Sequence, residues 1–276
     1  MSLKIEKILN NNAVIVRDGN GEKVAIGTGV AFNKRKNDLI NPNKIEKLFV
    51  MKEKEKFQQL LNRIPEEHFL ISEHIISFAE RQIGTKLNEH IHITLTDHIS
   101  FTIEREAEGI HVKNKLLHEI KILYKQEFEI GLWAVHYMRE KLNIDIPEDE
   151  AAFIALHIHT MKPKSKDLKE TIYQTTMIKD MVDIIKQRLS IEVEEDDLAY
   201  HRLITHLRYA LIRADQYEIR TLDDEMITMI RYKFPTSFQC ALYVAKELAN
   251  RYDISLPEQE LAYITLHIER LRKRGL

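Results

Sequence analysis

The pattern of apolar and polar residues in the first 50 positions predicts β-strands. Residues 13–17 (AVIVR) and 23–32 (KVAIGTGVAF) are rich in β-branched and aliphatic side chains, and the turn-forming sequence DGNG lies between them. Gly27 and Gly29 interrupt the second run, which predicts a bulge or a close approach of another segment to the backbone. A sheet of this size buries little apolar surface alone, so we expect it to pair as a symmetric dimer.

From Phe57 onward the apolar residues repeat with the period of an α-helix. Phe57, Leu60, Leu61 and Ile64 follow the i, i+3, i+4, i+7 spacing, and Pro65 is expected to open a second helix. Amphipathic segments continue to the end of the chain, with breaks at Gly84, Gly109, Gly131 and residues 161–167. The charged residues 51–56 (MKEKEK) are predicted to link the strand-rich and helical parts.

The helical part contains an internal repeat. Residues 146–158 (IPEDEAAFIALHI) and 256–268 (LPEQELAYITLHI) are identical at eight of thirteen positions, at an offset of 110. Residues 95–105 (LTDHISFTIER) and 203–213 (LITHLRYALIR) match at an offset of 108 and share Leu, His and Arg. Such self-similarity predicts two related helical domains in tandem.

The chain is therefore expected to be a multidomain protein of β and all-α parts. A small antiparallel β domain would occupy residues 1–56 and a linker helix residues 57–64. Two α-helical bundle domains would follow, at residues 65–170 and 171–276.

Charge separates the β part from the helical part. Residues 1–56 carry twelve Lys and Arg against seven Asp and Glu, a net charge of +5, whereas residues 57–276 carry −7. All thirteen histidines lie between His68 and His267. A basic head on an acidic body indicates a nucleic-acid-binding domain joined to a domain of another kind.

Two further features concern the compartment. No apolar segment approaches the roughly 18–20 residues of a membrane span, and Cys240 is the single cysteine. We therefore expect a cytoplasmic protein, with no membrane insertion and no disulfide within the chain.

Each copy of the repeat holds two matched histidines, which are His98 and His157, then His206 and His267. They could be core residues without a function. A zinc site would need three or four ligands, and the HExxH motif is absent. Nucleophilic catalysis lacks its usual motifs. Phosphorylation of a neutral imidazole suits paired histidines behind a nucleic-acid-binding head, and the repetition favours this interpretation.

Seven ordered motifs resemble those of the BglG/SacY-type transcriptional antiterminators over the whole chain. They are KILNNNAVIV (7–16), GTGVAFNKRKND (27–38), KIEKLF (44–49), LTDHISFTIER (95–105), IALHIHT (154–160), THLRYA (205–210) and YITLHIER (263–270). The family has a co-antiterminator RNA-binding domain followed by two phosphotransferase-system regulation domains. Residues 116–134 and 175–181 are most similar to the members that control sucrose operons.

The resemblance implies an RNA-binding regulator rather than an enzyme. It would stabilise an antiterminator hairpin in the nascent mRNA of a sugar-utilisation operon, so that the terminator cannot form. It implies a homodimer with no cofactor, metal or catalytic residue, and RNA contacts from Lys7, Asn10, Asn12, Gly27, Thr28, Gly29 and Phe32. Asn can bond base edges, Phe can stack on a base, and Gly lets the backbone approach RNA.

The resemblance also implies phosphorylation at His98, His157, His206 and His267. The donors would be a sugar-specific phosphotransferase permease for the first domain and the phosphocarrier HPr for the second, with opposite effects. Arg208 and Arg213, on the predicted helix of His206, are candidate partners for the added phosphate.

Two rival functions make different predictions. A DNA-binding regulator on the same body would need a helix-turn-helix head, which the strand-rich, Gly-containing residues 27–32 do not favour. A metallohydrolase would carry stoichiometric zinc or manganese when purified.

Overall fold

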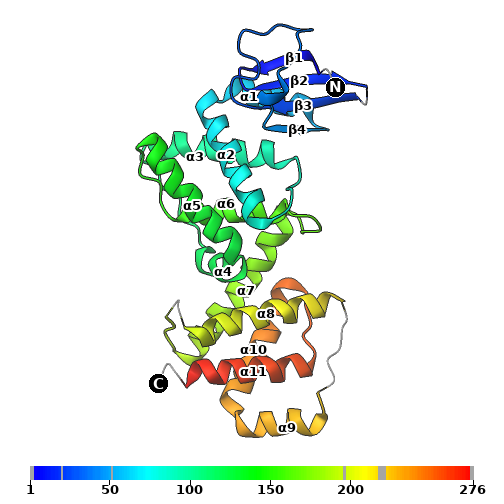
Figure 1. Ribbon diagram of the computed structural model, residues 1–276. Coiled ribbons are helices and arrows are strands. Elements are labelled where there is room, and N and C mark those ends of the chain that lie inside the picture. The colour runs from blue at the N-terminus through cyan, green and yellow to red at the C-terminus, as the bar shows by residue number, and fades with distance from the viewer. Residues whose placement is uncertain (1–2, 20, 51, 195–196, 217–221, 274–276) are drawn as a thin grey trace. The chain divides into compact units, whose positions relative to one another are not determined.

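The computed structural model describes residues 3–273 except 20, 51, 195–196 and 217–221 (Figure 1). The chain forms two compact units, each of which is described by itself. The first contains Met1–Asn114 and Gln126–Ser165, and the second contains Lys115–Lys125 and Lys166–Leu276. The predicted fold class, an antiparallel sheet followed by helical domains, is confirmed.

The first unit begins with a four-stranded antiparallel sheet in the order β1-β2-β3-β4. The strands are β1 (Lys4–Asn10), β2 (Ala13–Asp18), β3 (Gly21–Ile26) and β4 (Lys47–Phe49). Both faces of the sheet are apolar because alternate residues of β2 point to opposite sides. Val14 and Val16 pack against Val30 and Ile40 of the following loop, whereas Ala13 and Ile15 belong to a second core.

That second core is closed by the helix that was predicted as a linker. Helix α1 (Lys54–Arg63) places Phe57, Leu60 and Leu61 against the sheet, together with Phe69. The linker helix therefore shares a core with both the sheet and the following helix.

The prediction of a strand over residues 23–32 is wrong from Gly27 onward. Gly29 has a φ of 63°, and the Val30 and Phe32 amides donate to the Gly27 and Gly29 carbonyls, which makes successive turns. The predicted close approach at Gly27 is confirmed, since an added Cβ would lie 1.8 Å from the Lys44 carbonyl oxygen.

Besides α1, the helices of the first unit are α2 (Glu66–Ile83), α3 (Ile91–Ala107), α5 (Lys125–Leu142) and α6 (Asp149–Thr160). Those of the second are α7 (Leu168–Leu189), α8 (Leu198–Gln216), α9 (Asp224–Lys233), α10 (Pro235–Tyr252) and α11 (Glu258–Arg272). Short α4 (Leu117–Leu123) also belongs to the second unit, where it packs against α7 and α8. The repeated motifs occupy α3 and α6 in the first copy and α8 and α11 in the second.

Candidate functional site

The histidines that the repeat singles out form one pair in each copy. His98 on α3 and His157 on α6 have ring centroids 4.9 Å apart. His206 on α8 and His267 on α11 have ring centroids 3.9 Å apart. Residues that are 59 or 61 positions apart in the sequence are thus brought together twice, by the same pairing of helices.

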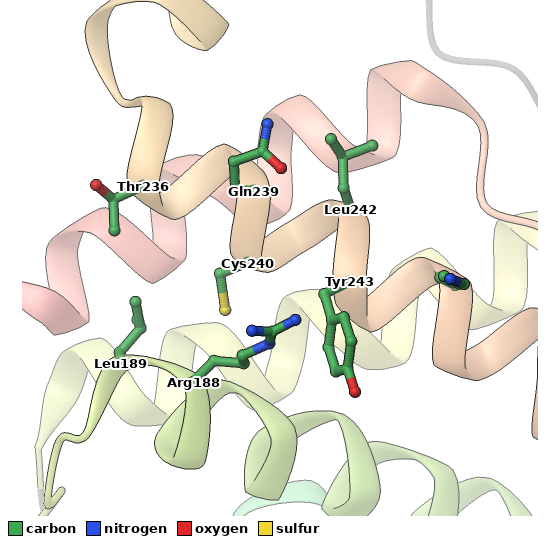
Figure 2. A pocket seen from close by; sticks show the side chains of 8 residues that line it. Arg188, Leu189, Thr236, Gln239, Cys240, Leu242 and Tyr243 are labelled. Atoms are coloured by element: carbon green, nitrogen blue, oxygen red, sulfur yellow. The ribbon is translucent and has the colours of Figure 1, made fainter.

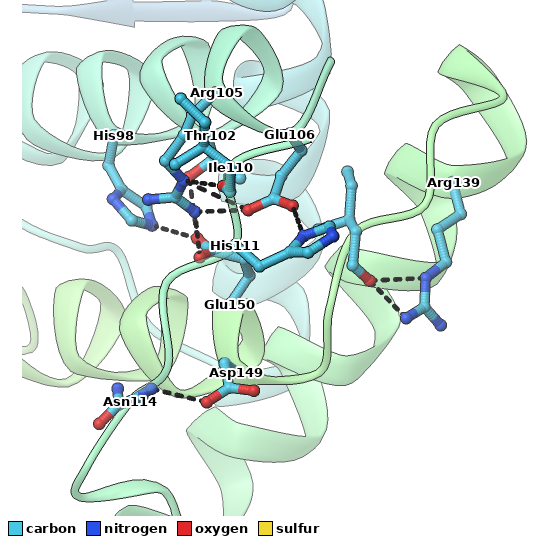
Figure 3. Close-up of polar contacts among 11 residues, drawn as sticks. His98, Thr102, Arg105, Glu106, Ile110, His111, Asn114, Arg139, Asp149 and Glu150 are labelled. Atoms are coloured by element: carbon cyan, nitrogen blue, oxygen red, sulfur yellow. Dashed lines mark hydrogen bonds and ion pairs between the residues drawn. The ribbon is translucent and has the colours of Figure 1, made fainter. Parts of the chain in front are cut away.

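An arginine–glutamate ion pair crosses the same two helices in each copy. In the first, Arg105 Nη2 lies 2.5 Å from the Glu150 carboxylate (Figure 3). In the second, Arg213 donates through Nε and Nη2 to both oxygens of Glu260, at 2.6 Å. Both carboxylates are buried, so each needs such a partner. This pair holds together the two helices that carry the histidines.

In the first copy the ion pair extends to a histidine. His98 Nε2 lies 3.3 Å from Glu150 Oε2, and the Thr102 hydroxyl donates to the same carboxylate (Figure 3). Burial alone would raise the pKa of Glu150, but His98, Thr102 and Arg105 outweigh it and lower that pKa. Glu150 therefore stays ionised beside the first pair.

The second histidine of each pair is neutral at physiological pH. Burial, followed by the neighbouring His98, lowers the pKa of His157 to about 3. Burial, and then His206, Arg270 and Arg202, lower the pKa of His267 to about 4. A neutral imidazole has a nitrogen lone pair, which a nucleophile toward phosphorus requires.

The sequence signals some of the buried carboxylates of the two copies and not others. Glu150 and Glu260 gave a signal, because both recur at the repeat offset seven positions before the second histidine. The buried Glu127 carboxylate accepts from His159 Nδ1 at 2.9 Å. The repeat gave no signal for Glu127, because its equivalent in the second copy is Ser237.

Of the residues expected to contact RNA, Phe32 is the exposed aromatic one. Its side chain is 61% exposed at the end of the Gly27–Gly29 turn region. Lys7 is exposed on β1 and donates to Gln58 Oε1 at 2.6 Å. Asn10, at the end of β1, accepts from the Asn12 amide through Oδ1 at 2.8 Å. A ligand could reach these side chains by displacing only the Lys7–Gln58 and Asn10–Asn12 hydrogen bonds.

Asn12 and Thr28 are instead held by the protein. Asn12 is 4% exposed, accepts from the Gly29 amide at 2.6 Å and donates to Glu66 at the start of α2. The Thr28 amide and hydroxyl both donate to Glu46 at 3.0 Å. In this structure the two residues position the backbone of the Gly27–Gly29 turn.

Neither the main surface pocket nor a group of metal-binding side chains coincides with the paired histidines in the described part of the chain. A surface pocket of about 550 Å³ lies between α7 and α10, where the Arg188 guanidinium stacks 3.7 Å above the Tyr243 ring (Figure 2). None of the paired histidines lines it. Within the described residues, no three His, Cys, Asp or Glu side chains are grouped to hold a metal ion. No helix in that part of the chain is long and apolar enough to cross a membrane.

Comparison with known proteins identifies the kind of molecule. A family model of the CAT RNA binding domain matches residues 3–58, and one of the PRD domain matches residues 73–161 and 179–271. The four-stranded sheet thus belongs to an RNA-binding domain, and the two helical copies are a duplicated regulatory domain.

Relatives match over the full length. The chain is 38% identical to the transcription antiterminator LicT of Bacillus subtilis (strain 168), over 99% of this chain and 100% of that protein. It is 35% identical to the beta-glucoside operon antiterminator of Dickeya chrysanthemi, over 98% of this chain and 97% of that protein. The crystal structure of GlcT CAT-PRDI is similar with a TM-score of 0.55 and 39% identity, over 58% of this chain and 98% of that one. The chain belongs to the BglG-type transcription antiterminators, as its motifs predict.

Proposed function

We propose that this chain stabilises an antiterminator hairpin in the nascent mRNA of a sugar-utilisation operon. The competing terminator hairpin then cannot form, and transcription continues into the operon. The strongest support is the pair of histidines at equivalent places in two copies behind an RNA-binding domain. The protein would act in the cytoplasm, where bacterial transcripts are made, and as a homodimer whose RNA-binding heads pair.

Phosphorylation of the paired histidines is the proposed control. His98 and His157 accept phosphate from the sugar-specific permease when its sugar is absent, which inactivates the protein. His206 and His267 accept it from HPr when preferred sugars are scarce, which activates the protein. The low pKa values of His157 and His267 support this proposal, because both rings remain nucleophilic at neutral pH.

The proposed RNA surface consists of Phe32, Lys7 and Asn10, with the Gly27–Gly29 turn as backbone support. Phe32 stacks on an unpaired base, Asn10 bonds a base edge and Lys7 contacts phosphate. Asn12 and Thr28 act by holding the turn, since their polar groups are occupied by Glu66 and Glu46.

We propose sucrose as the inducing sugar. Sequence similarity favours sucrose, whereas one relative is named for a beta-glucoside operon. A reporter operon in cells with the matching permease, supplied with sucrose or with a β-glucoside such as salicin, distinguishes the two by which sugar induces expression.

RNA binding by the full-length chain tests the head. Phe32→Ala and Asn10→Ala should each weaken binding to the hairpin by roughly 1–3 kcal/mol through lost stacking or base-edge bonds. Leu39→Ala, a change at a 52% exposed apolar residue of the same domain, is the control. Binding should also weaken steeply with salt. Unchanged affinity in both variants, with the fold intact, contradicts the assigned surface.

The same reporter tests whether phosphorylation of the first pair inactivates the protein and phosphorylation of the second pair activates it. His98→Ala or His157→Ala should give expression without the sugar, while His206→Ala or His267→Ala should lower it. Inactive first-copy variants would show that the signs are reversed.

A further inference from the structure

The two histidine pairs differ in the charged residues one helical turn away. Arg202 precedes His206 by four positions on α8, and Arg270 follows His267 by three on α11. Residues at these spacings share a helix face. Burial and His206 lower the pKa of His267 most, and both guanidinium charges lower it further.

The first copy has no cation at either position. The repeat offsets of 108 and 110 place Thr94 and Thr160 there. Their hydroxyls donate to backbone carbonyls of their own helices, at 3.4 Å for His90 and 2.9 Å for Leu156. The charged group that contacts the first pair is the Glu150 carboxylate, 3.3 Å from His98 Nε2 and paired with Arg105.

Other arginines of the second copy are already engaged. Arg213 is bound to Glu260, and Arg208 donates to the Leu123 carbonyl at 3.2 Å and lies over the Tyr124 ring. By contrast, neither Arg202 nor Arg270 forms an ion pair within the part of the chain that the structure describes. His267 Nδ1 is buried without a hydrogen-bond partner among those residues.

We propose that Arg202 and Arg270 form a phosphoryl-binding site that receives the phosphate on the second histidine pair, and that the first pair lacks such a site. This inference rests on the proposed phosphorylation. In the transfer, an imidazole lone pair forms the new N–P bond while the donor's N–P bond breaks and the donor nitrogen keeps the electron pair. The guanidinium groups offset the two negative charges of the phosphoryl group, whereas Thr94 and Thr160 supply no such charge in the first copy.

Phosphoramidate is a suitable probe because it needs no partner protein. It transfers its phosphoryl group to neutral imidazole and releases ammonia, so the product is a phosphorylated imidazolium ring. The full-length chain is treated at neutral pH, and the rate of phosphohistidine formation at each pair is followed by peptide mass spectrometry without acid.

Arg202→Gln and Arg270→Gln should each slow labelling of the second pair roughly tenfold, since each removes a charge-assisted bond. Labelling of His98 and His157 should not change. Arg202→Lys and Arg270→Lys should restore part of the rate, because the positive charge rather than packing is at work. Arg188→Gln, at an exposed arginine elsewhere in the same unit, is the matched control.

The converse variant transfers the site. Thr94→Arg combined with Thr160→Arg should speed labelling of the first pair. Wild-type rates in both Gln variants overturn the inference while leaving phosphorylation itself intact. A wild-type chain that takes no phosphate at His206 or His267 overturns the proposed phosphoacceptor role, and the inference with it.

Discussion

The two copies of the repeat preserve the same electrostatic arrangement with different residues. In the first, the Glu127 carboxylate on α5 accepts from His159 and from Lys162 at 2.9 and 2.5 Å. In the second, the equivalents of these three residues are Ser237, Glu269 and Arg272. There the carboxylate lies on α11, and accepts from Ser237 at 2.7 Å and Arg272 at 3.0 Å.

The carboxylate thus lies on α5 in the first copy and on α11 in the second, whereas its cationic partner, Lys162 or Arg272, occupies the equivalent position in both. None of the three positions keeps its residue type between the copies. In both, however, the three residues include one buried glutamate that is hydrogen-bonded to the other two. Divergence after duplication was therefore constrained by charge balance rather than by residue identity. At the histidine pairs the balance itself differs, because Arg202 and Arg270 of the second copy are replaced by Thr94 and Thr160 in the first.

The largest expected effect tests the feature that both copies share. Arg105→Met should destabilise the first unit by about 3–5 kcal/mol, because it leaves the buried carboxylates of Glu150 and Glu106 without their cation. Arg213→Met removes the partner of Glu260 alone and should cost the second unit less. Urea unfolding of the full-length chain measures both, with Arg81→Met, at an exposed arginine, as the surface control. Equal costs would show that Glu106 is satisfied without Arg105.

A smaller effect is expected where the copies pack differently. A Cβ on Gly131 would lie 2.2 Å from the Ala151 carbonyl oxygen, so α5 and α6 approach closely at that point. The second copy has buried Ala241 there and accommodates a methyl group. Gly131→Ala should destabilise the chain by about 1–3 kcal/mol through overpacking.

The reciprocal change, Ala241→Gly, should cost only about 1 kcal/mol through helix propensity. Thermal unfolding monitored by circular dichroism measures both changes. A stabilised Gly131→Ala variant would mean that α5 and α6 separate without cost.

These contrasts show which features the sequence could predict. The histidine pairs follow from the repeat, because a duplicated pair of helices brings the same two positions together twice. The arginine–glutamate pair recurs too, and so was visible in the alignment of the copies. The β head followed from its β-branched runs.

Features that depend on contacts distant in the sequence could not be predicted. Asn12 is expected to contact RNA, but its side chain is buried between Glu66 at the start of α2 and the Gly29 amide. The Gly27–Phe32 segment has the composition of a strand, but the left-handed Gly29 turns it. Seven-residue α4 has too little periodicity to indicate that it packs against α7 and α8.

Acid sensitivity should be greater in the first unit than in the second. The folded-state pKa of His157 is about 3, below the unfolded value of about 6.5, so below pH 6.5 the unfolded chain binds a proton that the folded chain does not. Stability is therefore lost as the pH falls from 6.5 toward 3, by up to about 1.4 kcal/mol per pH unit. For His267 the window ends near pH 4.

His157→Gln isolates that contribution. Urea unfolding between pH 4 and 7 should show a flatter dependence in this variant than in wild type, while the change at neutral pH reports lost packing only. An unchanged slope would mean that His157 is already protonated in the folded protein.

The smallest effect concerns a helix end that the copies share. Asn143 after α5 and Asp253 after α10 occupy equivalent positions and have positive φ values of 53° and 57°. Each amide donates to the carbonyl four residues earlier, so both close a helix. Asn suits this left-handed position, whereas the negative charge of Asp also lies unfavourably at the negative end of the helix dipole.

Asp253→Asn should therefore stabilise the second unit, and Asn143→Asp should destabilise the first, each by roughly 0.3–1 kcal/mol at low salt. The two shifts should shrink together as salt is added, because screening weakens the charge–dipole interaction. Salt-independent shifts would assign the difference to backbone conformation instead.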